Sequence, residues 1–359
     1  MRSISISSCG EVIDLLYVSN EVRDLVIKDL APPYRIEEGN SNRRPSICVS
    51  EVDDINQLLN KAKRKVELQH NKVKEIYLRK PANSPNLVRK ASEQIFEDGS
   101  RLISSQDESG IVVYLDQDGK NIEIGSHGPR REIAAEIRRV VRDQVVISKL
   151  ESKGAVTVHS ALLVNGDGLG VLIVGTQGAG KTSFFLTALA QPGWTSISCE
   201  RNTIWLENGL LRCLPSPEKI SFFPGILYQF EETRNFSKKT EEEFTWKRSE
   251  KFHIHWRDIL DRFGKPVPNE PIEIKSIVFP RYGEDFICMR NDNFPVDIFR
   301  PEIQTGCKQP HPNWLKKYVR NEAAAEKTIT QLMKLTSFNV LWATPKDISK
   351  ALENVSRFY

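Results

Sequence analysis

The sequence predicts an α/β protein with a mixed α+β domain at its N-terminus, and three observations support that prediction. Residues 171–190 run from an apolar strand through a glycine-rich loop into an apolar-faced helix. Short alternating strands joined by turn residues fill 110–126 and 194–215. Helical periodicity occurs before, between and after these strands, and such alternation is typical of α/β architectures.

Composition indicates a globular protein of ordinary charge. The chain has 359 residues, 39% of them hydrophobic and 27% charged, which is long enough for two domains. It has no run of 18 apolar residues and no basic-then-apolar leader, so we expect a cytoplasmic protein without a membrane partner. A net charge of +4 is too small to indicate a nucleic-acid partner. The six cysteines form no CxxC pair, which predicts reduced thiols.

Residues 1–100 are predicted to form the N-terminal mixed domain, and no chemical motif occurs in them. Alternation predicts strands at 2–7 and 45–52. Apolar spacing predicts one helix over 54–78, and the prolines and asparagines of 78–90 predict a loop or hinge.

The rest of the chain predicts a second, larger α/β domain. A hairpin is expected around 117–119, and a helix from Gly128 to Leu150 with Pro129 at its start. The turn NGDG separates two strands, and the second of them leads into the glycine-rich loop. The later elements expected are three strands over 194–215, a strand at 273–280, a helix over 314–335, a strand at 338–343 and a helix from Pro345.

The loop after the second strand has the spacing of a nucleotide phosphate-binding loop, GxxxxGK[ST]. Glycines allow backbone amides to turn toward phosphate oxygens, and the following helix adds its positive end. Lys181 is expected to contact the β- and γ-phosphates, and Thr182 to offer its hydroxyl to Mg²⁺. The predicted nucleotide-binding residues are Gly175, Thr176, Gln177, Gly178, Ala179, Gly180, Lys181, Thr182 and Ser183.

The run VHSALLVNGDGLGVLIVGTQGAGKTSFFLTAL, followed by SISCERNTIWLENGLLRCLPSPEKI, resembles the catalytic domain of the HPr kinase/phosphorylase family. It is most similar to the HPr-kinase-like serine kinases of bacterial metabolism and natural-product clusters. The resemblance spans roughly residues 150–290, and only the general layout matches outside that range. It implies a P-loop kinase core related to phosphoenolpyruvate carboxykinase within a catalytic domain at 101–310, followed by a helix–strand–helix segment at 311–359. It also implies ATP and Mg²⁺ as cofactors, and family members often assemble as homo-oligomers.

The resemblance assigns site residues. His159 matches the family's strand histidine, and the family's acidic pair falls on Cys199 and Glu200. In the family the first acid acts as base toward the acceptor hydroxyl and the second lies near the metal. A thiol cannot serve as a carboxylate, so Glu200 is expected to act as base, as metal ligand, or as both. His159 then activates the acceptor hydroxyl or orients Glu200. The alternatives are a structural strand histidine, a surface ion pair between Glu200 and Arg201, and a small buried residue at position 199.

Three basic residues follow core strands and are candidates for contacting an anionic acceptor: Arg212, Lys219 and Arg281. Each could equally be a solvated surface charge. His253 and His255 form an i,i+2 pair without a nearby third ligand, so we expect them not to bind metal.

Two functions follow. The first is an ATP- and Mg²⁺-dependent kinase that phosphorylates a hydroxyl of a small metabolite, an amino acid or a peptide serine. The alternative is a nucleotide-binding regulatory protein or weak ATPase without a phosphoacceptor. The base-reading NKxD motif of GTPases does not occur, so adenine is inferred from the resemblance alone and guanine stays open.

Overall fold

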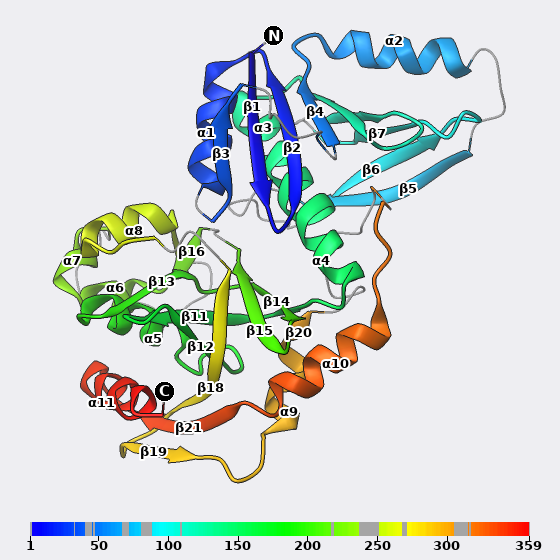
Figure 1. Cartoon of the computed structure of the whole chain (residues 1–359). Helices are drawn as coiled ribbons and strands as arrows, with labels where there is room; N and C mark the ends of the chain where they lie inside the picture. Colours follow the sequence, from blue (N-terminus) through cyan, green and yellow to red (C-terminus); the bar gives the residue numbers. More distant parts are fainter. Residues whose placement is uncertain are drawn as a thin grey trace. The chain divides into compact units, whose positions relative to one another are not determined.

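The structure is a computed structural model that describes residues 2–31, 33–39, 45, 47–66, 72–79, 88–107, 110–216, 219–236, 251–267, 271–304, 315 and 317–358. Contacts divide the chain into two compact units, drawn in Figure 1. Unit 1 comprises Met1–Ser152 with Gly306–Arg320, and unit 2 comprises Lys153–Thr305 with Asn321–Tyr359. The first division therefore lies at Ser152 rather than near residue 100, because the strands after residue 100 extend the N-terminal sheet.

Unit 1 is a nine-stranded mixed sheet in the order β3-β1-β2-β4-β9-β8-β7-β6-β5. Helices α1 and α3 pack side by side, and a π-helical segment, η1, continues α3 into α4. The strands are β1 (Arg2–Ser8), β2 (Glu11–Tyr17), β3 (Arg35–Glu38), β4 (Ile47–Glu51), β5 (Lys72–Arg79), β6 (Val88–Ile95), β7 (Arg101–Ser105), β8 (Val112–Leu115) and β9 (Asn121–Gly125). The helices are α1 (Asn20–Leu30), α2 (Ile55–Val66), α3 (Arg130–Arg139), η1 (Val140–Ile147) and α4 (Ser148–Ser152).

The predicted helix over 54–78 is wrong in its second half. Helix α2 ends at Val66, and residues 72–79 form strand β5, which pairs with β6 along its whole length. Cross-strand pairing thus overrides the helical spacing, as tertiary context often does. The hairpin within 110–126 is confirmed, because β8 and β9 pair antiparallel. Most of the predicted loop over 78–90 lies outside the described residues.

Unit 2 is built on a ten-stranded mixed sheet in which β12, β18 and β21 run parallel. Its path is β13-β11-β12-β18-β15-β14-β10-β20, and β21 pairs with both β18 and β19. The strands are β10 (Val156–Val158), β11 (Ser160–Asn165), β12 (Leu169–Val174), β13 (Trp194–Ser198), β14 (Asn202–Glu207), β15 (Leu210–Pro215), β18 (Ile272–Tyr282), β19 (Ile287–Arg290), β20 (Ile303–Gln304) and β21 (Thr336–Trp342). A separate pair is formed by β16 (Ile220–Phe222) and β17 (Phe252–Ile254).

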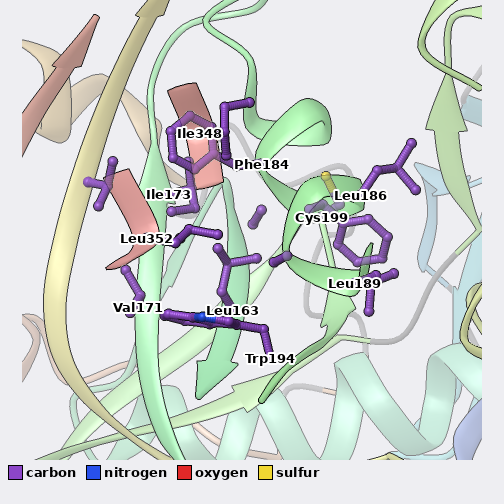
Figure 2. Close-up of a cluster of buried hydrophobic side chains, with 14 of the residues drawn as sticks. Leu163, Val171, Ile173, Phe184, Leu186, Leu189, Trp194, Cys199, Ile348 and Leu352 are labelled. Atoms are coloured by element: carbon purple, nitrogen blue, oxygen red, sulfur yellow. The ribbon is translucent and has the colours of Figure 1, made fainter. Parts of the chain in front are cut away.

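Helices cover both faces of this sheet, because core strands such as β11 and β12 are buried at consecutive positions and so present apolar side chains to both faces. Ile173 of β12 packs with α5 (Lys181–Ala190) and α11 (Pro345–Ser356), whereas Val174 packs with α10 (Glu322–Leu332). Figure 2 shows the first cluster, with Phe184 and Leu352 gathered near Ile173. The other helices are α6 (Pro224–Tyr228), α7 (Glu231–Arg234), α8 (Trp256–Phe263), α9 (Val296–Phe299) and the 3₁₀ turn η4 (Arg300–Glu302).

The elements predicted for 194–215, 338–343 and the helix from Pro345 have the predicted type, strand or helix. The three strands over 194–215 are β13, β14 and β15, and the last strand and helix are β21 and α11. Helix α10 is shorter than the predicted 314–335, since Asn321 caps its N-terminus. None of the described helices is both long and apolar enough to cross a membrane.

Leu352→Ala is expected to destabilise unit 2 by about 2–5 kcal/mol, because Leu352 is 0% exposed between α11 and the sheet. Urea unfolding followed by circular dichroism measures the loss. Glu353→Ala, at the exposed neighbouring position, is the control and should stay near wild type. Equal stability of the two variants would contradict this packing.

Candidate active site

Residues 175–180 form a tight loop between β12 and α5. Gly178 and Gly180 have φ of +88° and +109°, which glycine adopts without the penalty that a side chain imposes. Gly180 is the N-cap of α5, so the unpaired amides of the first helical turn face the end of the loop. The indole of Trp342 donates from Nε1 to the carbonyl of Ala179 at 3.1 Å. A hydrogen bond from Trp342, the last residue of β21, therefore fixes the loop backbone at Ala179.

Lys181 begins α5 and is only 8% exposed. Its ammonium donates to the carbonyl oxygens of Gly175 at 2.5 Å and Thr176 at 3.2 Å. Burial lowers the pKa of Lys181, and the nearby Glu302 and Glu200 oppose that shift. The side chain is thus a mostly buried cation held against the loop backbone.

The turn after β13 presents Cys199 and Glu200. Ser198 closes this turn by donating from Oγ to the carbonyl of Arg201 at 2.9 Å. The thiol of Cys199 donates to Thr182 Oγ1 at 3.6 Å, so position 199 contacts the hydroxyl predicted to bind Mg²⁺. Burial, followed by the charge of Glu200, raises the pKa of Cys199 to about 12. A thiol with that pKa is protonated at neutral pH and is a poor nucleophile.

His159, between β10 and β11, lies between two carboxylates. Its Nδ1 is 2.7 Å from Glu302 Oε2, and its Nε2 is 3.5 Å from Glu200 Oε2. Hydrogen bonds with Glu200 and then Glu302 raise the pKa of His159, while burial and the Lys181 charge lower it. The imidazolium form is favoured, and in that form both ring nitrogens are donors.

Glu302 is a residue that sequence reasoning missed. Strand β20 pairs with β10, and the His159 amide donates to the Glu302 carbonyl at 2.8 Å. The two residues are therefore hydrogen-bonded through their main chains as well as through their side chains. The two residues are 143 positions apart, and no local pattern marks them as partners. The structure thus gathers His159, Lys181 and Glu200, with Glu302 added to them.

Lys219 lies on the same side of unit 2 as Glu200. It precedes β16, and both Lys219 and Glu200 shift the pKa of His253 on β17. Burial is the main cause of that lowered pKa, and the charges of Lys219 and Lys251 add to it. His253 Nδ1 is 2.9 Å from Ser221 Oγ. The charges of Lys219, Lys251 and Glu200 therefore all act on His253, and neither Lys251 nor His253 was predicted as a substrate contact.

Arg212 lies at the opposite end of the sheet from the loop. It pairs across strands with Glu273 of β18, and their side chains approach within 3.9 Å. Glu273 in turn lies beside Leu169, where β12 begins, whereas the loop follows the end of β12. The direction of β15 decides this position, and the sequence alone does not show it.

Arg281, in contrast, lies at the loop end of β18. It follows Pro280, whose ring Cδ is 3.7 Å from where a Gly175 Cβ would stand. The Arg281 side chain is exposed. It can therefore reach solvent beside the loop.

The side chains of His253 and His255 have different partners. The His255 side chain caps α8 by accepting from the Arg257 amide at 3.3 Å, while His253 faces Ser221. Among the residues described, no group of three or more His, Cys, Asp or Glu side chains could hold a metal ion.

Neither protein-family models nor curated proteins match this sequence. Among solved structures, the HPr(Ser) kinase/phosphatase from Coxiella burnetii is similar at a TM-score of 0.27 and 14% identity. The match covers 56% of this chain and 95% of that one. This similarity is weak and does not show that the chain belongs to that family.

Gly180→Ala is expected to lower stability by more than the roughly 1–2 kcal/mol cost of a left-handed residue. Besides a φ of +109°, an added Cβ would lie 2.3 Å from a Trp342 ring carbon. Thermal unfolding with tryptophan fluorescence measures the effect. Gly168→Ala is the matched control, since Gly168 has a φ of +78° but open space around it. Equal losses in both variants would show that the indole does not confine the loop.

Proposed function

We propose that this protein is an ATP- and Mg²⁺-dependent kinase that transfers the γ-phosphate to a hydroxyl group. One observation carries the proposal: a glycine-rich loop and a buried lysine open helix α5 beside a histidine held between two carboxylates. Phosphoryl transfer depends mainly on positioning and charge neutralisation. An anion site next to a paired acid–base group can supply both.

The phosphates would bind at the start of α5. The positive φ angles of Gly178 and Gly180 turn the loop backbone, and the first-turn amides of a helix bind anions. Lys181 already lies at this end, bonded to two loop carbonyls. It would exchange those carbonyls for phosphate oxygens, and the buried surroundings would strengthen that contact.

The residues beside the loop fit a magnesium–nucleotide site with few protein ligands. Mg²⁺ typically takes one or two protein oxygens, several waters and the phosphates. Thr182 Oγ1 and a Glu200 oxygen are the donors on offer, and Cys199 would not serve because Mg²⁺ prefers oxygen. When bound, Mg²⁺ would neutralise charge on the phosphates.

The acceptor hydroxyl would approach His159 and Glu200. Glu302 fixes the imidazole through Nδ1, which leaves Nε2 directed toward Glu200. Glu200 is 38% exposed and His159 30% exposed, so both can meet a substrate. Lys219 and Lys251 give this side positive charge, which favours an acceptor that is itself anionic, such as a phosphorylated or carboxylate-bearing metabolite or an acidic peptide.

The contact between Cys199 and Thr182 supports a second candidate, a nucleotide-binding regulator or weak ATPase. In phosphate-loop enzymes an acidic residue beside this hydroxyl holds the magnesium ion, and here a protonated thiol takes that place. Weaker metal binding would slow transfer while leaving nucleotide binding through the loop intact.

Lys181→Ala is expected to abolish γ-phosphate transfer, because the mutation removes the buried cation beside the loop. The test uses γ-labelled ATP, Mg²⁺ and size-fractionated cell extract, followed by mass spectrometry for a phosphate-sized mass increase. Lys327→Ala, on the exposed face of α10, is the control and should retain wild-type transfer. Wild-type turnover in the Lys181 variant would contradict the site assignment. If the wild-type protein releases the label only as free phosphate, the result would favour the regulatory protein or weak ATPase.

Cys199→Asp is expected to preserve or raise transfer and to lower the Mg²⁺ concentration it needs, because a carboxylate would then lie beside Thr182. Magnesium titration of the labelled-ATP assay measures this. Cys199→Ala, which removes the thiol without adding charge, is the control. Lost transfer in Cys199→Asp with unchanged unfolding and ATP affinity would mean that the site needs a neutral group there.

A further inference from the structure

We propose that the exposed ring of Tyr282 is the platform on which the base of the bound nucleotide stacks. The inference rests on the proposed function, because it takes the loop 175–180 as the phosphate site. It adds a binding site for the nucleoside end of the ligand, on the opposite side of β12 from His159 and Glu200.

The parallel strands bring Tyr282 to the loop. Strands β12, β18 and β21 are neighbours that run the same way, so their carboxyl ends share one edge of the sheet. The loop follows β12, Tyr282 ends β18 and Trp342 ends β21, with the two aromatic residues in register. Ligands of such sheets bind outside the carboxyl ends of the strands.

Trp342 fixes the platform to the loop. Its indole donates to Ala179 and leaves no room for a side chain at Gly180. The Tyr282 ring meets the indole edge to face, with centroids 5.3 Å apart and planes at 82°. Trp342 is 7% exposed and Tyr282 is 65% exposed. The tryptophan is thus the support, and the tyrosine offers its ring to solvent.

The strand order decides which end of a nucleotide reaches Tyr282. Cys199 and Glu200 follow β13, and His159 precedes β11, and both strands lie on one side of β12. Strands β18 and β21 lie on the other side. A γ-phosphate directed toward Glu200 therefore directs the nucleoside toward Tyr282.

An exposed aromatic ring suits a nucleobase because every base presents a π-face. Stacking of a base on an aromatic ring typically contributes about 1–3 kcal/mol, so removing the ring is expected to weaken binding roughly 5- to 150-fold. Stacking alone is tolerant of base identity, so this platform predicts that ATP and GTP bind with similar affinity. Purines should bind more tightly than pyrimidines, since they cover more of the ring.

The test compares ATP with inorganic tripolyphosphate on the full chain by isothermal titration calorimetry with Mg²⁺. Tyr282→Ala should weaken ATP binding at least fivefold and leave tripolyphosphate binding unchanged. Tyr282→Phe, which keeps the ring, should bind ATP like wild type. Met289→Ala, at a 58% exposed apolar position on β19, is the control for loss of surface bulk and should bind both ligands normally.

The outcomes separate the two proposals. Unchanged ATP affinity in Tyr282→Ala, with tripolyphosphate still bound, would overturn the platform and leave the phosphate site standing. Equal weakening of both ligands would also overturn it, because the ring would then act through the loop. A wild-type protein that binds neither ligand would overturn the proposed function and this inference together.

Discussion

The parallel pairing of β12 with β18, and of β18 with β21, is the constraint on which the site depends. It places the glycine-rich loop, Tyr282 and Trp342 at one edge of the sheet. Strand β18 also pairs with β15 near its beginning, through Ile272 and Glu273, and with β21 from Ser276 onward. The sheet therefore divides along β18, which is why Arg212 on β15 lies far from the loop while Trp342 supports it.

The neighbouring residues Cys199 and Glu200 face different partners. The thiol points to Thr182 on α5, and the carboxylate points to His159 beside β11. A single turn after β13 thus contacts both helix α5, which begins the proposed anion site, and the histidine bonded to Glu302. A substitution at position 199 therefore acts first on Thr182, and a substitution at position 200 acts first on His159.

Contiguous patterns made much of unit 2 predictable. The strand–loop–helix at 171–190 and the hairpin strands over 194–215 are encoded within short windows, and the structure has them where the periodicity indicates. Pairing over long separations was not predictable: Glu302 meets His159 through β20, and β5 replaces the second half of the helix predicted over 54–78. The distance of Arg212 from the loop was not predictable because strand direction follows from pairing, and the position of Tyr282 beside Trp342 was not predictable because a lone tyrosine at a strand end has no sequence pattern.

The hydrogen bond from Trp342 to Ala179 has a consequence for how the protein is made. Its partners are 163 residues apart, and the chain contributes Gly306–Arg320 to unit 1 before it returns to unit 2. During synthesis the loop leaves the ribosome long before β21, the strand that supports it. Until β21 is made, the sheet that holds β12 is incomplete and one edge of β18 is unpaired. Exposed strand edges of this kind recruit chaperones or neighbouring chains. The edge of β18 that pairs with β21 is therefore open from the time Tyr282 has been added until Trp342 has been added.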